Sequence, residues 1–533
     1  MSALTFENGF INVQFSDKYW ASKANDIVKK KALQSTISSK PKRRLIIDYS
    51  SPNIAKRMHV GHLRSTIIGD AIANIYEYLG WEVIRINHIG DFGTQFGMIL
   101  ALIFEENIEQ KILSGKVNLD DLEKMYKQSK IKFDENLDFR DKAYEFTRRL
   151  QTDLFKQGNN RDNDKNSSQI VKIWTKICEI SKENYSEIYK DLKIHKNLID
   201  RGESFYCSQM VEMTNLDDNP NPNFTFENNM LLYKIKSKKF KNAPPLILKK
   251  SDGGFTYDTS DLACLKYRIK VEKADKIIYV TDIGQSVHFE NLFMAGEELG
   301  IVDSLHSTNN KKTHAHVILE HIKFGLVLDE NKQKFKTRSG DNIKLNDLIQ
   351  DSFEVVAAQL KSSQVAKFKD EEHFNTNTRN LAISCIKFSD LISKREKSYV
   401  YNFERMVAYQ GRTGAYVLYS YLRLVRILDK IEMKETNKRL DHIAQTLSIE
   451  ERNLLKQISQ FYDKLDNFEN NHNLTSIADW LYNLAVIFTE FYSRHKVIEN
   501  GVVNQDRQFI CVATKVAMEQ GFQLLGLHAV DEM

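Results

Sequence analysis

Cysteine and proline are scarce in the 533-residue chain, and each shortage narrows the class of protein. The five cysteines lie far apart and form no CxxC pair. This pattern excludes a disulfide framework and a cysteine-ligated zinc site, and it indicates a reducing compartment, so we expect a cytoplasmic protein. Only 6 prolines accompany 42% hydrophobic and 28% charged residues, a composition typical of an ordered, helix-rich globular chain.

Long apolar runs are also lacking, and charges of the two signs nearly balance. No run reaches the length of a membrane span, and the start shows no basic segment followed by an apolar one, so we expect neither membrane contact nor a signal peptide. The net charge of +5 comes from 76 basic and 71 acidic residues. A polyanion would therefore have to bind a local basic patch.

The segment after residue 43 predicts a βαβ unit. An apolar strand, "RLIIDYSS", is followed by a loop, a helix with apolar residues at helical spacing up to residue 79, and a second strand, "EVIRINHIGD". Such a unit implies a parallel sheet. Later strands are expected at residues 276–284 and 314–325, whereas the pattern after about residue 398 is almost purely helical.

The loop after the first strand, in "SSPNIAKRMHVGHLRS" (residues 50–65), carries the most informative motif. Doubly wound folds bind nucleotides in such loops, and a helix N-terminus attracts phosphate. Gly61 lets a ligand approach the backbone, and His59 and His62 could donate hydrogen bonds to charge developing on a transferring phosphorus. Taken alone, an HxxH pair also fits two surface histidines near a turn or an incomplete metal site.

In its wider context this motif resembles the HIGH signature of class I aminoacyl-tRNA synthetases, and in detail that of arginyl-tRNA synthetases. Further stretches match that family in the same order. They are "WEVIRINHIGDFGTQFGM", "RGESFY", "KSDGGFTYDTSDLA", "IIYVTDIGQSVHFENLF", "KFKTRSGD" and "GRTGAYVLYSYLRL". Phe92 stands where the family commonly has tryptophan, a conservative exchange.

The resemblance implies an α/β fold: a Rossmann-like parallel-sheet catalytic domain at residues 41–398, with an insertion at about 105–242, and an all-α anticodon-binding domain at 399–533. Residues 1–40 would be a short remnant and linker of an N-terminal domain of about a hundred residues that grips the tRNA elbow in the family. The "SSKPKRR" run in this linker could contact RNA or simply be solvated. The implied reaction activates arginine with ATP as arginyl-adenylate and transfers it to tRNA(Arg). We expect ATP as its Mg²⁺ complex, no protein-bound metal, and a monomer.

The resemblance assigns two phosphate-binding elements. The first is His59, Gly61 and His62. The second is "KFKTRSG", in place of the family's KMSK loop, where a solvated cationic loop is the alternative reading. Lys56 would compensate for a missing loop lysine. The full ATP and catalytic set comprises Lys56, His59, Gly61, His62, His321, Phe324, Lys336, Arg338 and Ser339.

For arginine, the resemblance implies a pocket that holds the guanidinium and the amino group. A guanidinium pairs best with a carboxylate in bidentate geometry, and residues 257 and 261 share one helical face. An ordinary surface acid is the alternative for Asp261, and we expect a structural or mixed role for His288. The arginine set comprises Asp48, Asn53, Tyr257, Asp261 and Gln285.

For tRNA, aromatic residues on a basic helical face can stack on splayed anticodon bases. The set implied by the resemblance is Tyr416, Tyr419, Arg423 and Tyr492, with core packing as the alternative for Tyr416 and Tyr492. Asp531 and Glu532 are acidic residues at positions where the family has a positive group near the anticodon site.

Two other functions remain open. A synthetase paralogue would activate or sense arginine without charging tRNA. An ATP-binding nucleotidylyltransferase would share the HxGH signature, although the guanidinium pocket and the helical tail argue against it.

Overall fold

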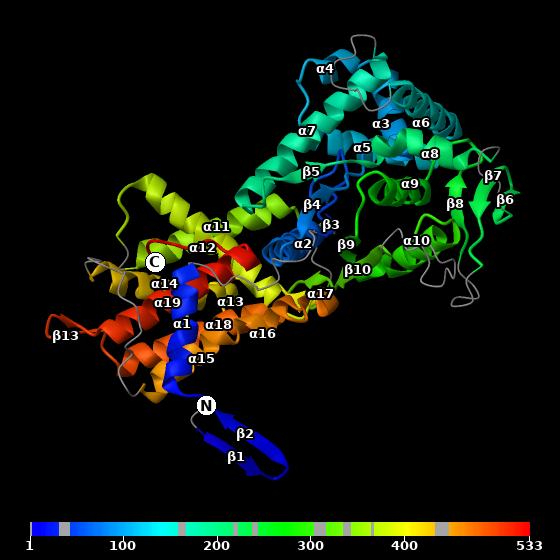
Figure 1. Cartoon of the computed structure of the whole chain (residues 1–533). Helices are drawn as coiled ribbons and strands as arrows, with labels where there is room; N and C mark the ends of the chain where they lie inside the picture. The colour runs from blue at the N-terminus through cyan, green and yellow to red at the C-terminus, as the bar shows by residue number, and fades with distance from the viewer. Residues whose placement is uncertain are drawn as a thin grey trace.

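A five-stranded parallel sheet forms the centre of the molecule (Figure 1). The computed structural model describes residues 3–30, 43–157, 167–216, 222–236, 244–302, 316–333, 343–363, 367–431 and 447–533. The sheet order is β10-β9-β3-β4-β5, and every neighbouring pair is parallel. The strands are β3 (Arg44–Asp48), β4 (Glu82–Asn87), β5 (Leu198–Asp200), β9 (Lys276–Asp282) and β10 (Ile318–Phe324). The predicted strands and their parallel arrangement are confirmed.

Helices pack on this sheet, and the helix after β3 is buried along most of its length. That helix, α2, approaches the sheet closely because Gly69 has no side chain: a Cβ there would lie 2.3 Å from the ring of Tyr49. Other helices lie between the sheet strands along the chain. Together with α2 (Val60–Tyr78) they include α3 (Thr94–Glu105), α9 (Tyr257–Lys270), the short η2 (Ile283–Gln285) and α10 (Ser286–Glu298).

The segment between α3 and α9 forms a separate lobe of helices and a small antiparallel sheet (Figure 1, cyan to green). Its helices are α4 (Glu109–Leu113), α5 (Leu119–Glu135), α6 (Leu137–Gln157), α7 (Gln169–Asp191), η1 (Glu203–Tyr206) and α8 (Cys207–Thr214). Its strands are β6 (Phe224–Glu227), β7 (Met230–Tyr233) and β8 (Leu246–Lys249). β5 adds the edge strand of the central sheet, so this lobe is tied into the core.

The chain after residue 398 is helical, as predicted, with small additions, and two helices at residues 345–391, before that point, belong to the same helical part. Its helices pack around a core that includes the fully buried Trp480. They are α11 (Leu345–Ser362), α12 (Glu371–Leu391), α13 (Phe403–Met406), α14 (Gly414–Asp429), α15 (Ile449–Ser459), α16 (Phe461–Leu465), α17 (Phe468–Asn471), α18 (Leu474–Arg494) and α19 (Gln505–Leu525). Two-residue strands, not anticipated, form two short pairs: β11 (Val327–Leu328) with β12 (Tyr399–Val400), and β13 (Ile498–Glu499) with β14 (Val502–Val503).

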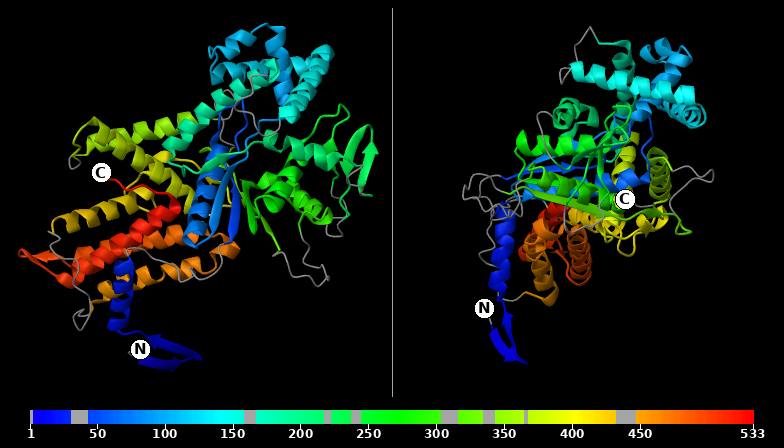
Figure 2. Two further views of the ribbon diagram at one scale, coloured as in Figure 1. Left: turned by 45° about the horizontal axis from the view of Figure 1, so that its top comes forward. Right: turned by 90° about the vertical axis from the view of Figure 1, so that its right-hand side faces the viewer.

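The N-terminal segment is a β-hairpin followed by a helix that lies on the C-terminal helices. The elements are β1 (Ala3–Glu7), β2 (Phe10–Gln14) and α1 (Asp17–Lys30). An ion pair of 2.8 Å between Asp17 and Arg452 fixes α1 on α15, and the hairpin projects away from the body in every view (Figures 1 and 2). Over the described part of the chain, no helix combines the length and the apolar character that crossing a membrane requires.

A buried histidine lies where the C-terminal helices meet the sheet domain. The Nε2 atom of His472, which follows α17, is 2.8 Å from the hydroxyl of Tyr76 on α2. Burial, together with the nearby cations Lys276 and Arg395, lowers the pKa of His472 to about 3. His472 therefore stays neutral in the folded protein at ordinary pH.

Because His472 stays neutral in the folded protein, we expect the free energy of unfolding to depend on pH. Below the ordinary imidazole pKa of 6.5 the unfolded chain takes up a proton that folded His472 refuses, so folding stability falls as pH drops, by about 1.4 kcal/mol per pH unit for this one group. Urea unfolding of His472→Gln between about pH 4 and 6.5 should show a shallower dependence than wild type. Asn470→Gln, at an exposed position on α17 without a titratable group, is the control that should leave the slope unchanged.

Candidate active site

The loop between β3 and α2 holds an unusual backbone. Ser50, Ser51 and Ala55 have φ values of 73°, 47° and 60°, a left-handed region that residues with a side chain adopt at a cost of about 1–3 kcal/mol each. Three such residues within six positions mark this loop as strained, and strain of this kind gathers at functional sites.

Three separate elements hold the strained loop in place by capturing its backbone N–H groups. The N–H of Ser50 donates to Oγ of Ser65 on α2 (2.9 Å), and the N–H of Ser51 donates to Asn87 at the end of β4 (3.0 Å). The N–H of Ala55 donates to Oγ of Ser181 on α7 (3.0 Å). The loop shape is thus imposed by side chains from α2, from the sheet and from the inserted lobe.

The two motif histidines form a reciprocal cap at the start of α2. Nδ1 of His59 accepts from the N–H of Gly61 (3.1 Å), and Nδ1 of His62 accepts from the N–H of His59 (3.0 Å). The ring centroids are 4.0 Å apart. A Cβ at Gly61 would lie 2.9 Å from Cε1 of His59, so glycine is required at this position for the cap to close. The HxGH spacing thus places the two histidines and the glycine at the positions that this cap requires.

This cap also fixes the protonation state of the rings. Because each Nδ1 accepts a hydrogen bond, the proton of each neutral imidazole is assigned to Nε2. Burial lowers the pKa of His62 to about 3, with a further contribution from His59, so His62 is a neutral N–H donor at physiological pH. Such a donor at a helix N-terminus suits the oxygens of a phosphate group.

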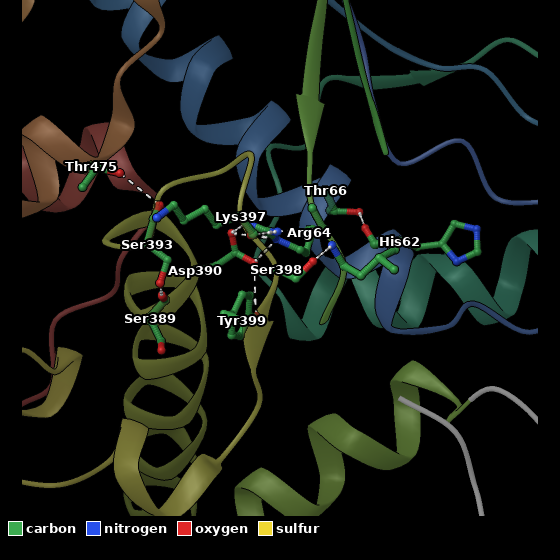
Figure 3. Close-up of polar contacts among 12 residues, drawn as sticks. His62, Arg64, Thr66, Ser389, Asp390, Ser393, Lys397, Ser398, Tyr399 and Thr475 are labelled. Carbon is green, nitrogen blue, oxygen red and sulfur yellow. Dashed lines mark hydrogen bonds and ion pairs between the residues drawn. The ribbon is translucent and has the colours of Figure 1, made fainter. Parts of the chain in front are cut away.

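Two residues after His62, a fully buried arginine joins α2 to α12 (Figure 3). Nε of Arg64 lies 3.0 Å from Oδ2 of Asp390, and its Nη1 donates to the carbonyl of Gly325 (2.7 Å). Asp390 also accepts from the hydroxyl of Tyr399 (3.2 Å). Burial raises the pKa of Asp390, whereas the Arg64 cation opposes that rise. The ion pair therefore fixes the helix that carries His62 against the C-terminal helices.

The predicted second phosphate element, with Lys336, Arg338 and Ser339, lies outside the described residues, but the residue that follows it is placed. Lys344 forms an antiparallel bridge with His59, and the N–H of Leu345 donates to the carbonyl of Met58 (2.9 Å). The described chain therefore resumes, at residues 343–345, beside the histidine cap. Nζ of Lys56 lies 4.3 Å from the ring of Tyr126 on α5.

An acidic pocket is formed by side chains of α9, and Asn53 of the β3–α2 loop lines the same cavity. Oδ2 of Asp261 is 2.7 Å from Nε2 of His288, and Oδ1 is 3.6 Å from Nε2 of His88. Burial raises the pKa of Asp261, but the hydrogen bond and charge of His288 outweigh it, so the net shift is downward. Tyr257, one turn earlier, is 63% exposed, and its ring packs edge-on against His288. Asp261 and Tyr257 are therefore brought together, as predicted.

The sequence analysis did not single out another acid of this pocket, Glu203 in η1. Burial and the charges of Asp261 and Asp91 raise its pKa well above the ordinary value. A cavity of about 470 Å³ is lined by Glu203 together with Asn53, Tyr257 and Asp258. Although "RGESFY" matched the family, one glutamate in a short stretch carries no pattern of its own. Clustered, partly buried carboxylates of this kind favour a cationic ligand.

The other residues predicted to bind arginine differ in their exposure and hydrogen bonding, and of these Asn53 lines the cavity. Both carboxylate oxygens of Asp48 accept hydrogen bonds, one from the buried Arg268 (2.6 Å) and one from Ser51 (2.9 Å). Asn53 and Gln285 are exposed. A Cβ at Gly90 would lie 2.4 Å from Oδ1 of Asn53, so Gly90 provides the space for that amide.

The two residues predicted beside adenine differ in exposure. His321 on β10 is partly exposed and bonds Oγ1 of Thr281 through Nε2 (2.8 Å). Burial lowers its pKa to about 4. Phe324 is buried, with its ring 5.6 Å from the Arg64 guanidinium, so it packs beneath the site.

Three of the four predicted tRNA-binding residues line one cavity of about 830 Å³ between α14 and α18, namely Tyr419, Arg423 and Tyr492. The Arg423 guanidinium lies 5.0 Å from the ring of Tyr419 and 5.7 Å from that of Tyr492. Tyr416 instead packs against Tyr482. Arg426, Lys430 and Lys496 add positive charge to the lining, and Arg426 forms an ion pair with Glu532.

Comparisons with known proteins agree with this architecture. Residues 23–403 match the family of class I (R) tRNA synthetase catalytic domains, and residues 417–533 match the DALR anticodon binding domain. The chain is 36% identical over 539 residues to the cytoplasmic arginine–tRNA ligase of Xenopus tropicalis, covering 98% of this chain and 76% of that protein. It is 37% identical over 543 residues to the probable cytoplasmic arginine–tRNA ligase of Caenorhabditis elegans, covering 99% and 70%.

Solved structures give the same result. The crystal structure of arginyl-tRNA synthetase from Plasmodium falciparum superimposes with a TM-score of 0.78 at 29% identity, covering 100% of this chain and 86% of that one. Catalytic fold, anticodon-binding module and nearly full-length similarity coincide, and the chain therefore belongs to the arginyl-tRNA synthetase family of class I aminoacyl-tRNA synthetases.

Proposed function

We propose that the protein is an arginine–tRNA ligase, which activates arginine with ATP as arginyl-adenylate and transfers the arginyl group to tRNA(Arg). The observation that carries this proposal is that the loop leading to the capped histidine pair also contributes Asn53 to the cavity lined by the carboxylates of Glu203 and Asp258. Carboxylates suit the guanidinium of the substrate, and the cap suits the phosphates of ATP. We assign the protein to the cytoplasm and expect a monomer.

In the first step the arginine carboxylate attacks the α-phosphorus of ATP and pyrophosphate leaves. Both reactants are anionic, so positioning and oriented donors must supply most of the catalysis. We assign phosphate contacts to His59 and His62, and further cationic contacts to Lys336 and Arg338, with ATP arriving as its Mg²⁺ complex. Lys56, close to the cap, is proposed to supplement them, and Gly61 and Ser339 to provide backbone and hydroxyl contacts.

For the arginine substrate, we assign the guanidinium to Asp261, Glu203 and Tyr257, and the amino end to Asn53, Gln285 and Asp48. Because Asp48 is already held by Arg268 and Ser51, its contact would add to those bonds. His321 is proposed to lie beside adenine, with Phe324 packed behind it.

In the second step a terminal ribose hydroxyl of tRNA attacks the activated carbonyl and AMP leaves. We assign anticodon contacts to the cavity between α14 and α18, where Tyr419 and Tyr492 could stack on bases and the cations could meet phosphates. Tyr416, packed on Tyr482, is proposed to support this surface.

Arginine-dependent ATP–pyrophosphate exchange, run with and without tRNA(Arg) and alongside tRNA charging, tests the function. Arginine-dependent exchange together with charging is the expected result. Exchange without any charging would show that arginine is activated for another acceptor, and the absence of both reactions would refute the proposal.

The histidine cap allows structure and chemistry to be separated in a second test. In His62→Asn the amide oxygen can replace Nδ1 as the acceptor from His59, whereas the Nε2–H donor is lost. We expect the variant to keep its melting temperature and arginine affinity but to form adenylate about 10²–10³-fold more slowly, as when one transition-state donor is removed. A normal single-turnover rate would remove His62 from the catalytic set. His373→Gln is the control.

A further inference from the structure

The ring of His288, in the first turn of α10, lies between two carboxylates of the substrate pocket. Its Nε2 is 2.7 Å from Oδ2 of Asp261, and its Nδ1 is 3.6 Å from Oδ1 of Asp258. Both acids belong to α9, one turn apart, and all three side chains are less than one-fifth exposed. A neutral imidazole has a single N–H and can donate to only one of these carboxylates, whereas an imidazolium donates toward both.

The charges around this ring favour the imidazolium. Asp258 and Asp261 face it from α9, whereas Glu203 beside Asp261 has a raised pKa that favours its neutral form. Arg268 on α9 is a permanent cation whose charge also acts on Asp261. His321 on β10 is held neutral by a lowered pKa, and His88 lies against the other carboxylate oxygen of Asp261. Burial opposes the charge on His288, but the hydrogen bond to Asp261 and the two carboxylates outweigh it and raise the pKa of His288 above 6.5.

We propose that His288 is the internal cation of the empty arginine pocket: its imidazolium neutralises the carboxylates of Asp261 and Asp258, and it releases one proton to solvent when the substrate guanidinium takes over that role. This inference rests on the proposed function, because it concerns the same pocket. His288 thus sets the charge selectivity and the pH dependence of arginine binding, and it does so without contacting the reacting atoms.

The proton leaves His288 because two cations would otherwise share the same carboxylates. A guanidinium that pairs with Asp261 brings a second cation next to the imidazolium, and like charges in a partly buried site disfavour the ionised form of the weaker base. Guanidinium does not lose its proton in proteins, so the imidazole does. Arginine affinity should therefore rise up to tenfold per pH unit below the pKa of His288 and level off above it.

Isothermal titration of L-arginine into the full-length protein, without ATP, tests this. Titrations in two buffers with different ionisation enthalpies, between about pH 6 and 8.5, measure the number of protons released. We expect nearly one proton released per arginine at the acidic end, falling toward zero at the alkaline end. His288→Gln should bind arginine with no such release and with a flat pH profile, whereas His373→Gln, with a ring facing Asp531 far from the pocket, should behave as wild type.

A second measurement needs no variant at His288. In protein labelled with ¹⁵N-histidine, arginine added at constant pH should move one imidazole from the imidazolium to the neutral pattern of nitrogen shifts. Arginine binding without proton release, or release that persists in His288→Gln, would overturn this inference and leave the proposed function intact. A wild-type protein that binds no arginine at any pH would overturn the proposed function, and this inference with it.

Discussion

Replacement of Arg64 by methionine should destabilise the protein by about 3–5 kcal/mol, the usual penalty for leaving one charge of a buried ion pair without its partner. Arg64 and Asp390 are both fully buried, and Arg64 also donates to the carbonyls of Gly325 and Lys397. In Arg64→Met the carboxylate of Asp390 loses the cation that opposes its burial. Chemical denaturation followed by circular dichroism would measure the loss.

Two comparisons sharpen this prediction. Asp390 should bind a proton more readily once Arg64 is gone, so the deficit should shrink as pH falls, and Arg64→Met combined with Asp390→Leu should recover part of the stability. Arg412→Met removes one partner of the exposed pair with Asp479 and should cost at most about 1 kcal/mol. Equal costs for Arg64→Met and Arg412→Met would show that the buried pair contributes little.

Replacement of Asp261 by asparagine should weaken arginine binding by about 10²–10³-fold, within the 2–5 kcal/mol that truncating one partner of a buried charge pair costs. The amide keeps the size of the carboxylate but removes the charge that pairs with a guanidinium. The KM for arginine in the charging reaction, or direct titration of arginine, would measure the effect, while the KM for ATP should change little.

The control for Asp261→Asn is Glu297→Gln, an exposed acid further along α10. It removes the same unit of charge at a distance from the pocket and should leave arginine affinity unchanged. Unchanged arginine affinity in Asp261→Asn would refute the assignment of the guanidinium to this carboxylate.

Four of the five strands of the central sheet could be predicted because each has a local signal, whereas the three-residue β5 was not predicted. Apolar β-branched runs at residues 44–48, 82–87 and 276–282 form parallel strands, and the helical tail follows its apolar periodicity. The short pairs β11–β12 and β13–β14 could not be predicted, because two-residue strands have no period to read.

The site could be predicted only where a motif marks it. The HxGH spacing identified His59 and His62, and the family resemblance identified Asp261 and Tyr257. Arg64 and Asp390 are 326 positions apart, and Arg268 and Asp48 are 220 positions apart, so no local pattern reveals that they meet. The domain boundaries and the ligand contacts of the individual residues remain predictions.

The strained loop after β3 bears on how the site is assembled during folding. Its backbone is held by Ser65 from α2, Asn87 from β4 and Ser181 from α7. These residues lie 15, 36 and 126 positions along the chain from the loop residues that they bind. The contact with Ser181, 126 positions from Ala55, has the largest loop-closure cost of the three. The catalytic loop thus has its full set of backbone contacts only when the inserted lobe is docked, which makes that lobe an integral part of the catalytic centre and not a detachable module.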